Sequence, residues 1–129
     1  MNIPEELLYT KEHEWIKIEG NLATVGITDY AQNSLGDITF VELPEVGSKV
    51  KQFEKFSTVE SVKAASDVYA PISGKIIKIN EELINAPENI NQSPYEKAWF
   101  AVIEIEDIKQ KQNLLSSSNY RDYIEGLSE

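Results

Sequence analysis

The chain has 129 residues, 41% of them hydrophobic, which suits one domain with a core of moderate size. Its 22 acidic and 12 basic side chains give a formal net charge of −10, which repels phosphate backbones and argues against a nucleic-acid partner. With no cysteine, disulfides, thiolate nucleophiles and cysteine-rich metal sites are excluded.

The first fifteen residues show no basic region followed by an apolar stretch, which is the pattern of a secretory signal. No apolar run approaches the roughly 20 residues that span a bilayer. We therefore expect a soluble, cytoplasmic protein with no membrane partner. A single domain over residues 1–129 is expected to comprise a β body over residues 10–106 and a helical tail over residues 107–129.

The first elements along the chain are a hairpin and a short helix. Apolar residues alternate in "EHEWIKIEGNLATVGIT" on both sides of Gly20 and Asn21, which tolerate the positive φ of tight turns. Thr28 can cap a helix over Asp29–Leu35, and Gly36 can end it. The sequence therefore predicts a β-hairpin followed by a helix of seven residues.

Short strands separated by turn residues are predicted from Asp37 to Glu106. Their segments are "DITFVEL", "FSTVESV", "SDVYA", "GKIIKIN" and "WFAVIEIE". The segment "APENINQSP" between the last two has no periodicity, and we expect it to be a surface connection. "VELPEVG" and "VYAPISG" share the pattern V-x-x-P-x-x-G, either by chance or because one strand-turn unit is used twice.

The tail has helical spacing in a polar background. Its apolar positions are Leu114, Leu115, Tyr120, Tyr123, Ile124 and Leu127. Two short amphipathic helices are predicted, packed on a mainly β body. We expect Trp15, Trp99, Phe100 and the tail tyrosines to pack in the core or against the helices.

Lys63 lies between two strand-like runs, in a short segment of small residues. Spacing alone favours an exposed turn lysine that aids solubility. A catalytic lysine needs burial or cationic neighbours, whereas Glu60 and Asp67 favour the charged amine. A third reading is that the exposed amine on its flexible stem is reached by a modifying enzyme and carries an acyl group.

The segment "VESVKAASDVYAPISG" resembles the attachment site of lipoyl domains. Nearly the whole chain is similar, in the same order, to the H proteins of the glycine cleavage system. The similarity rests on "HEWIKIEG", "ATVGITDYAQNSLGDITFVELPEVG", the Lys63 segment and "SPYEKAW". A biotinyl domain would place Met on both sides of the lysine, where this chain has Val62 and Ala64.

The resemblance implies a mainly β fold, the barrel-sandwich hybrid of lipoyl domains, with one short internal helix and short C-terminal helices. It implies a non-catalytic carrier with lipoate amide-linked to Lys63. Such a carrier takes an aminomethyl group and electrons from glycine decarboxylase (P protein) to aminomethyltransferase (T protein) and dihydrolipoyl dehydrogenase (L protein). Lipoate ligase or an octanoyl/lipoyl transferase would attach the group. Tethering would give each enzyme a high effective concentration of its substrate.

The resemblance also implies two sets of residues around the arm. The first set would shape the turn that the lipoylating enzyme reads: Glu60, Ser61, Val62, Ala64 and Asp67. The second would belong to a surface cleft into which the loaded arm folds: Glu12, Glu14 and Ser34, with Asp67 as a further contact. Some relatives have His at the positions of Tyr30 and Ser34, so an imidazole contact there must be replaced or absent.

Other interpretations remain beside the carrier. An H-like protein can act mainly as a relay that hands octanoyl or lipoyl groups to other lipoyl enzymes, and it would use the same Lys63. A metal or acid-base site at Glu12, His13 and Glu14 is disfavoured, because the chain has no second histidine and lacks the spacing of "HExxH". No motif indicates an enzyme with a pocket of convergent polar groups.

Overall fold

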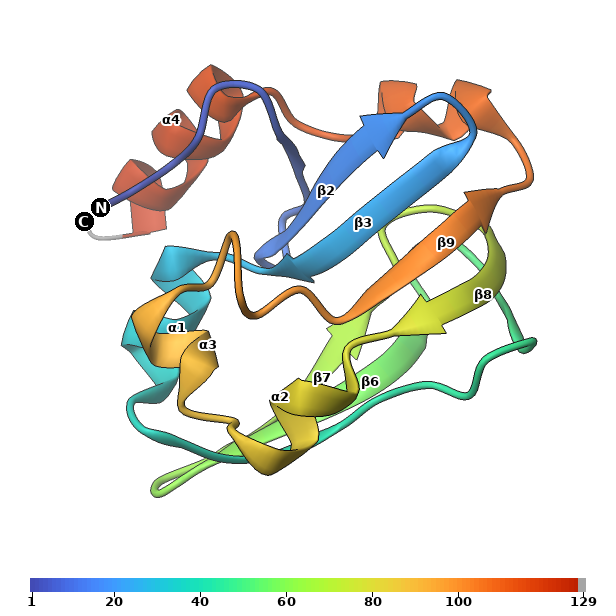
Figure 1. The fold of residues 1–129 in the computed structure, drawn as a ribbon. Helices are drawn as coiled ribbons and strands as arrows, with labels where there is room; N and C mark the ends of the chain where they lie inside the picture. Colours follow the sequence, from blue (N-terminus) through green and yellow to red (C-terminus); the bar gives the residue numbers. More distant parts are fainter. Residues whose placement is uncertain (128–129) are drawn as a thin grey trace.

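A computed structural model describes residues 1–127 as two antiparallel sheets with short helices around them (Figure 1). The six-stranded sheet has the order β1-β2-β3-β9-β8-β5, and the three-stranded sheet has the order β4-β6-β7. The strands are β1 (Leu8–Tyr9), β2 (Glu14–Glu19), β3 (Leu22–Ile27), β4 (Ile38–Glu42), β5 (Lys49–Val50), β6 (Lys55–Ser61), β7 (Ala65–Tyr69), β8 (Gly74–Ile79) and β9 (Ala101–Ile105).

The helices are short and lie in the connections and at the C-terminal end. They are α1 (Asp29–Leu35), α2 (Glu81–Asn85), α3 (Asn89–Gln92), the 3₁₀ helix η1 (Ile108–Asn113) and α4 (Ser117–Leu127). The mainly β fold expected from the sequence is confirmed. No helix among the described residues is long and apolar enough to cross a membrane.

The predicted hairpin and internal helix both form with the expected boundaries. β2 and β3 pair from Glu14↔Ile27 to Glu19↔Leu22, and the turn between them has Gly20 at φ 63°. The Thr28 side chain accepts a hydrogen bond from the Ala31 N–H and so caps α1. Local sequence signals were sufficient here because each boundary is set by a residue with its own backbone requirement.

The main core lies between the two sheets. The side chains that point inward from both sheets are almost completely buried, including Val41, Val59, Val68, Ile76 and Ile103. On β6 and β7 the inward residues alternate with exposed or partly exposed ones, as expected for a sheet with one face toward solvent. The β6–β7 hairpin is therefore fixed on the core through one face only.

The repeated V-x-x-P-x-x-G pattern corresponds to a repeated structural step. Its first copy leads from β4 in the small sheet to β5 in the large one, and its second copy leads from β7 to β8 in the same way. The two arrival strands, β5 and β8, pair with each other. The chain between the copies contains β6 and the turn with Lys63.

A second cluster joins the N-terminal segment to α4. Tyr9 and Tyr120 stack with ring centroids 4.6 Å apart, and Ile3, Leu7 and Ile124 are buried beside them. The Tyr120 hydroxyl lies 2.7 Å from Thr28 Oγ1 and 2.9 Å from His13 Nδ1. Burial lowers the pKa of His13, which favours a neutral ring that can accept from the Tyr120 hydroxyl.

Burial of the tail tyrosine and of the other aromatic residues confirms their expected packing. Trp15 and Phe100 are buried, and Trp99 packs against the second cluster. One detail of the tail was wrong. Leu114 and Leu115 are not helical: η1 ends at Asn113, and Leu115 forms an isolated antiparallel bridge with Tyr9 instead.

The expectation of a surface connection over residues 86–94 was also wrong. The segment contains α3, and Ile90 in this helix is completely buried in the main core. Asn91 donates hydrogen bonds to Gly36 O at 2.9 Å and to Gln32 Oε1 at 3.0 Å, and its Oδ1 accepts one from the Ile38 N–H at 2.9 Å. A single buried residue in a four-residue helix produces no periodicity, so the sequence pattern gave no signal.

We predict that Ile90→Ala lowers the free energy of unfolding by about 2–5 kcal/mol, because it removes a fully buried side chain and leaves a cavity. Urea unfolding monitored by circular dichroism measures this loss. Ile84→Ala on α2 is a matched control, since Ile84 is 49% exposed and its loss should change stability by no more than about 0.5 kcal/mol. Equal losses in the two variants would contradict the placement of α3.

Candidate functional site

Lys63 lies at the tip of the β6–β7 hairpin, where the chain projects from the body (lower left in Figure 1). The turn consists of Val62, Lys63 and Ala64, all exposed. The Ser61 N–H donates to the Ala64 carbonyl at 2.8 Å, and the Ser61 Oγ accepts from the Lys63 and Ala64 N–H groups at 3.3 and 3.1 Å. The hydroxyl of Ser61 therefore closes the turn from inside, as Ser does in side-chain-stabilised turns.

The turn is also tied to the segment between α1 and β4. The Val62 N–H donates to the Asp37 carbonyl oxygen at 3.1 Å. The stem of Lys63 lies against Gly36, so that a Cβ placed on Gly36 would be 3.4 Å from Lys63 Cε. Gly36 has φ 82° and ψ −158°, a conformation that is essentially restricted to glycine. The backbone beside the lysine is thus both close and sterically small.

The charges around the turn leave the Lys63 amine accessible. In residues 1–127 the one ion pair joins Lys55 to Asp67, at 3.4 Å, and does not involve Lys63. Asp67 lies within β7 opposite Thr58, away from the turn, whereas Glu60 is paired with Ala65 directly beside it. An exposed primary amine on a fixed turn fits an amide-linked lipoyl group, and Gly36 leaves room along the stem.

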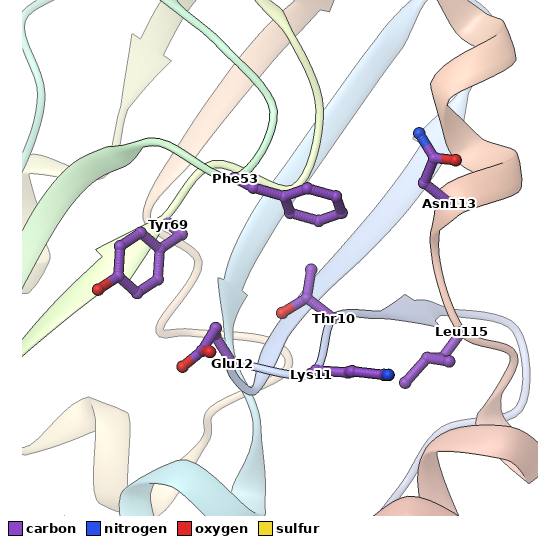
Figure 2. A pocket seen from close by; sticks show the side chains of 7 residues that line it. All are labelled: Thr10, Lys11, Glu12, Phe53, Tyr69, Asn113 and Leu115. Atoms are coloured by element: carbon purple, nitrogen blue, oxygen red, sulfur yellow. The ribbon is translucent and has the colours of Figure 1, made fainter.

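A cavity of about 370 Å³ opens at the other end of the hairpin. Figure 2 shows Phe53 and Tyr69 facing Lys11 and Leu115 across it, with Thr10 between them. Its remaining lining residues are Glu12 and Asn113. At about 3.3 Å per residue, Tyr69 lies about 20 Å along the strand from Lys63. The cavity and the lysine therefore lie at opposite ends of the hairpin.

Glu14 lies beneath this region with its carboxyl group buried. Thr10 Oγ1 donates to Glu14 Oε1, and the Tyr69 N–H donates to Glu14 Oε2 at 3.2 Å, which links β2 to the end of β7. Burial is the largest influence and raises the pKa of Glu14 to about 7; these two hydrogen bonds lower it, and the charge of Glu12 raises it further. The group titrates near neutral pH in the folded protein.

The structure separates the three residues expected in a docking cleft. Glu12 lines the cavity, Glu14 is buried next to it, and Ser34 is exposed on α1 near the Lys63 end. Sequence reasoning missed the cavity residues Phe53, Tyr69, Asn113 and Leu115, because they come from three separate segments. It also missed the contact of Gly36 with Lys63, although the glycine itself was identified as a helix end.

The pKa of Glu14 leads to a prediction about stability and pH. Because its folded value of about 7 exceeds the ordinary 4.5, the folded state binds this proton more tightly, and its contribution to stability is lost as the pH rises from about 4.5 to about 7. We predict that Glu14→Gln becomes progressively more stable relative to wild type over this range, by on the order of a few kcal/mol in total.

Urea unfolding of both proteins at several pH values between 4.5 and 8 measures this difference. His13 acts in the opposite direction, since its lowered pKa makes stability fall as the pH decreases through 6.5, but it is present in both proteins and cancels in the comparison. A difference between the two proteins that does not change with pH would contradict a buried, titrating Glu14.

The chain is similar to known proteins over nearly its whole length. The sequence profile of the family described as "Glycine cleavage H-protein" matches residues 7–126. The glycine cleavage system H protein of Staphylococcus epidermidis is 58% identical over 124 residues, covering 96% of this chain and 98% of that protein. The H protein of Halalkalibacterium halodurans is 54% identical over 123 residues, covering 95% and 96%.

A solved structure agrees with the fold. The crystal structure of a glycine cleavage system H protein from Mycobacterium marinum superimposes with a TM-score of 0.86 at 38% identity, covering 93% of this chain and 97% of that one. These similarities confirm the resemblance drawn from the sequence. The chain belongs to the glycine cleavage H-protein family, whose members are non-catalytic lipoyl carriers of the glycine cleavage system and bear lipoate on a lysine.

Proposed function

We propose that Lys63 is the residue to which lipoate is attached in this protein. The observation that carries the proposal is the turn itself, which presents an exposed amine that is free of ion pairs within residues 1–127. Its backbone is fixed by three hydrogen bonds within the turn, which involve Ser61, and by one to the Asp37 carbonyl. The amine forms an amide with a lipoyl carboxyl group activated as its adenylate, and the nucleotide leaves. When attached, lipoate supplies a disulfide that accepts two electrons and a transferable group.

The work of the chain's own residues is to present this lysine. Val59 and Val68 fix the hairpin on the core, while Ser61 holds the three exposed residues in one turn. A fixed base with a flexible stem gives each enzyme a high local concentration of the group without immobilising it. We propose glycine decarboxylase, aminomethyltransferase and dihydrolipoyl dehydrogenase as the partners between which the protein carries an aminomethyl group and electrons.

The acidic surface supports association with these partners. The chain has a formal net charge of −10, and Glu42, Glu60 and Asp67 are exposed on the outer side of the sheet that ends in the Lys63 turn. Charge of one sign around a docking site accelerates encounters with a surface of the opposite sign. Basic rims around the entrances of the partner enzymes would complement this face.

We predict that Lys63→Arg abolishes lipoylation, because Arg keeps the charge but offers no acylable amine. Purified protein is incubated with a lipoate ligase, lipoate and ATP, and its intact mass is measured. Lys78→Arg is the matched control, since Lys78 is also exposed but lies on β8 and not in the turn. The Lys78→Arg protein should remain fully modified. A lipoyl adduct on the Lys63→Arg protein would place the attachment site elsewhere.

We further propose that the cavity at Glu12 receives the end of the arm when it carries a cationic amine. Thr10, Phe53, Tyr69 and Leu115 provide an apolar hollow, and the exposed carboxylate of Glu12 lies on its wall. An apolar hollow excludes water from a labile group, while a carboxylate pairs with an ammonium. Asp67 lies on the strand between Lys63 and Tyr69, along the path to this hollow.

For this docking we predict that Glu12→Gln weakens the docked state by up to about fivefold, the equivalent of about 1 kcal/mol for an exposed ion pair. Amide chemical shifts of Thr10 and Asn113 are compared before and after the lipoylated protein is incubated with glycine and glycine decarboxylase. Shifts should occur in wild type and in the control Glu19→Gln, and should be smaller in Glu12→Gln. Unchanged shifts in wild type would show that the arm does not enter the cavity.

A further inference from the structure

Residues 86–94, which were expected to form a surface connection, contain α3, and this helix supports the segment to which the Lys63 turn is bonded. The side-chain amide of Asn91 on α3 makes three hydrogen bonds: the nitrogen donates to Gly36 O and to Gln32 Oε1, and the oxygen accepts from the Ile38 N–H. Gly36 and Ile38 are the two neighbours of Asp37. One side chain therefore holds the backbone on each side of the residue to which the turn is tied.

Asp37 is the next link. Its carbonyl oxygen accepts the hydrogen bond from the Val62 N–H at 3.1 Å, which joins the Lys63 turn to a segment outside the hairpin. The hydrogen bonds of Ser61 fix the shape of the turn, but they all lie within it and do not determine where it stands relative to the body. Its placement depends on the hairpin strands, on the pairing of Ser61 with Ile38 of β4 and on this bond to Asp37.

The segment that carries Asp37 is held by β6 on one side, because Ile38 is buried in the core and pairs with Ser61, and the Thr39 hydroxyl donates to the Glu60 carbonyl at 3.2 Å. The β4–β6 register shifts between Ile38 and Phe40, so regular pairing is interrupted where β4 begins. Gly36 ends α1 in a glycine-only conformation and carries no side chain that could anchor the segment. Asn91 adds a second anchorage from outside the hairpin with three hydrogen bonds, and the buried side chain of Ile90 next to it fixes α3 on the core.

We propose that Asn91 is a positioning residue for the carrier lysine: it holds Gly36, Asp37 and Ile38 in place, and through the Asp37–Val62 hydrogen bond it sets the position from which Lys63 is presented. This proposal rests on the assignment of lipoate to Lys63. Without Asn91 the turn keeps its shape but occupies several positions. Since an enzyme that attaches lipoate binds only the competent fraction of these, its apparent affinity falls while the chemical step is unchanged.

The experiment compares Asn91→Ala with Asn80→Ala. Asn80 is a matched control, because its side-chain amide also donates two hydrogen bonds, in its case to the backbone carbonyls of Lys97 and Trp99, and neither bond leads to the Lys63 turn. Amide hydrogen exchange is measured at Val62 and Ser61 by NMR. Lipoylation by a lipoate ligase with lipoate and ATP is followed by intact mass, and KM and kcat for the protein substrate are determined.

We expect exchange at the Val62 amide to be about two- to tenfold faster in Asn91→Ala than in wild type, because the hydrogen bond from Val62 to Asp37 is weakened and one hydrogen bond contributes a factor of this size. Exchange at the Ser61 amide should be unchanged. The KM of lipoylation should rise about two- to tenfold with kcat within about twofold of wild type. Asn80→Ala should show neither change. Asn91→Asp keeps the acceptor for the Ile38 N–H and the side-chain size, so it provides the same measurement if the alanine variant does not fold.

Two results would overturn the proposal: equal changes in the Asn91 and Asn80 variants, which would show a general loss of stability, or unchanged Val62 exchange in both Asn91 variants. Failure of the proposed attachment site gives a different result. In that case wild-type Lys63 stays unmodified in the ligase reaction, whereas exchange at Val62 still shows whether Asn91 holds the turn.

Discussion

The function of this chain depends on the hairpin of β6 and β7 being fixed on one face and free at its tip. Val59 and Val68 are buried between the sheets, and the strand pairing continues to Glu60↔Ala65, immediately before the turn. A long flexible side chain can be delivered reproducibly only from a base that does not move. The core therefore serves the turn directly, because it holds both strands of the hairpin.

The rest of the molecule is arranged around two ends of the same sheet. At the turn end, the Asn91 side chain on α3 binds Gly36 at the end of α1 and Ile38 at the start of β4, and Asp37 between them accepts the hydrogen bond from Val62. At the other end, buried polar groups join the N-terminal strands to α4 and to Tyr69: the Glu14 carboxyl, the His13 ring and the Tyr120 hydroxyl. These groups are hydrogen-bonded, as buried polar groups must be to avoid a large desolvation cost.

Most of the fold was predictable because its boundaries are marked by individual residues. Gly20 and Gly36 have positive φ, and Thr28 caps a helix with its own hydroxyl, so sequence alone located these positions. The turn with Lys63 followed from two strand patterns separated by small residues. Its role as a carrier did not follow from spacing, which favoured an ordinary exposed lysine, but from the resemblance of the surrounding segment to lipoyl sites.

What remained unpredicted depends on contacts between distant segments. Asn91 forms hydrogen bonds with residues that are between 53 and 59 positions away in the sequence, and Tyr69 and Asn113 line the same cavity although they come from β7 and η1. No local periodicity encodes such pairs. Glu14 illustrates the same limit, since the resemblance placed it in a surface cleft, while the fold buries its carboxyl group against Thr10 and Tyr69.

The bond that ties the Lys63 turn to the body has a consequence for how the sequence can vary. It joins the Val62 N–H, which every residue except proline can supply, to the Asp37 carbonyl, which every residue can supply. The side chains of Val62 and Asp37 are exposed and can change without altering this bond. Substitution is restricted at the neighbouring positions instead: at Gly36 by its backbone conformation, and at Asn91 by three hydrogen bonds that only a carboxamide of this length completes.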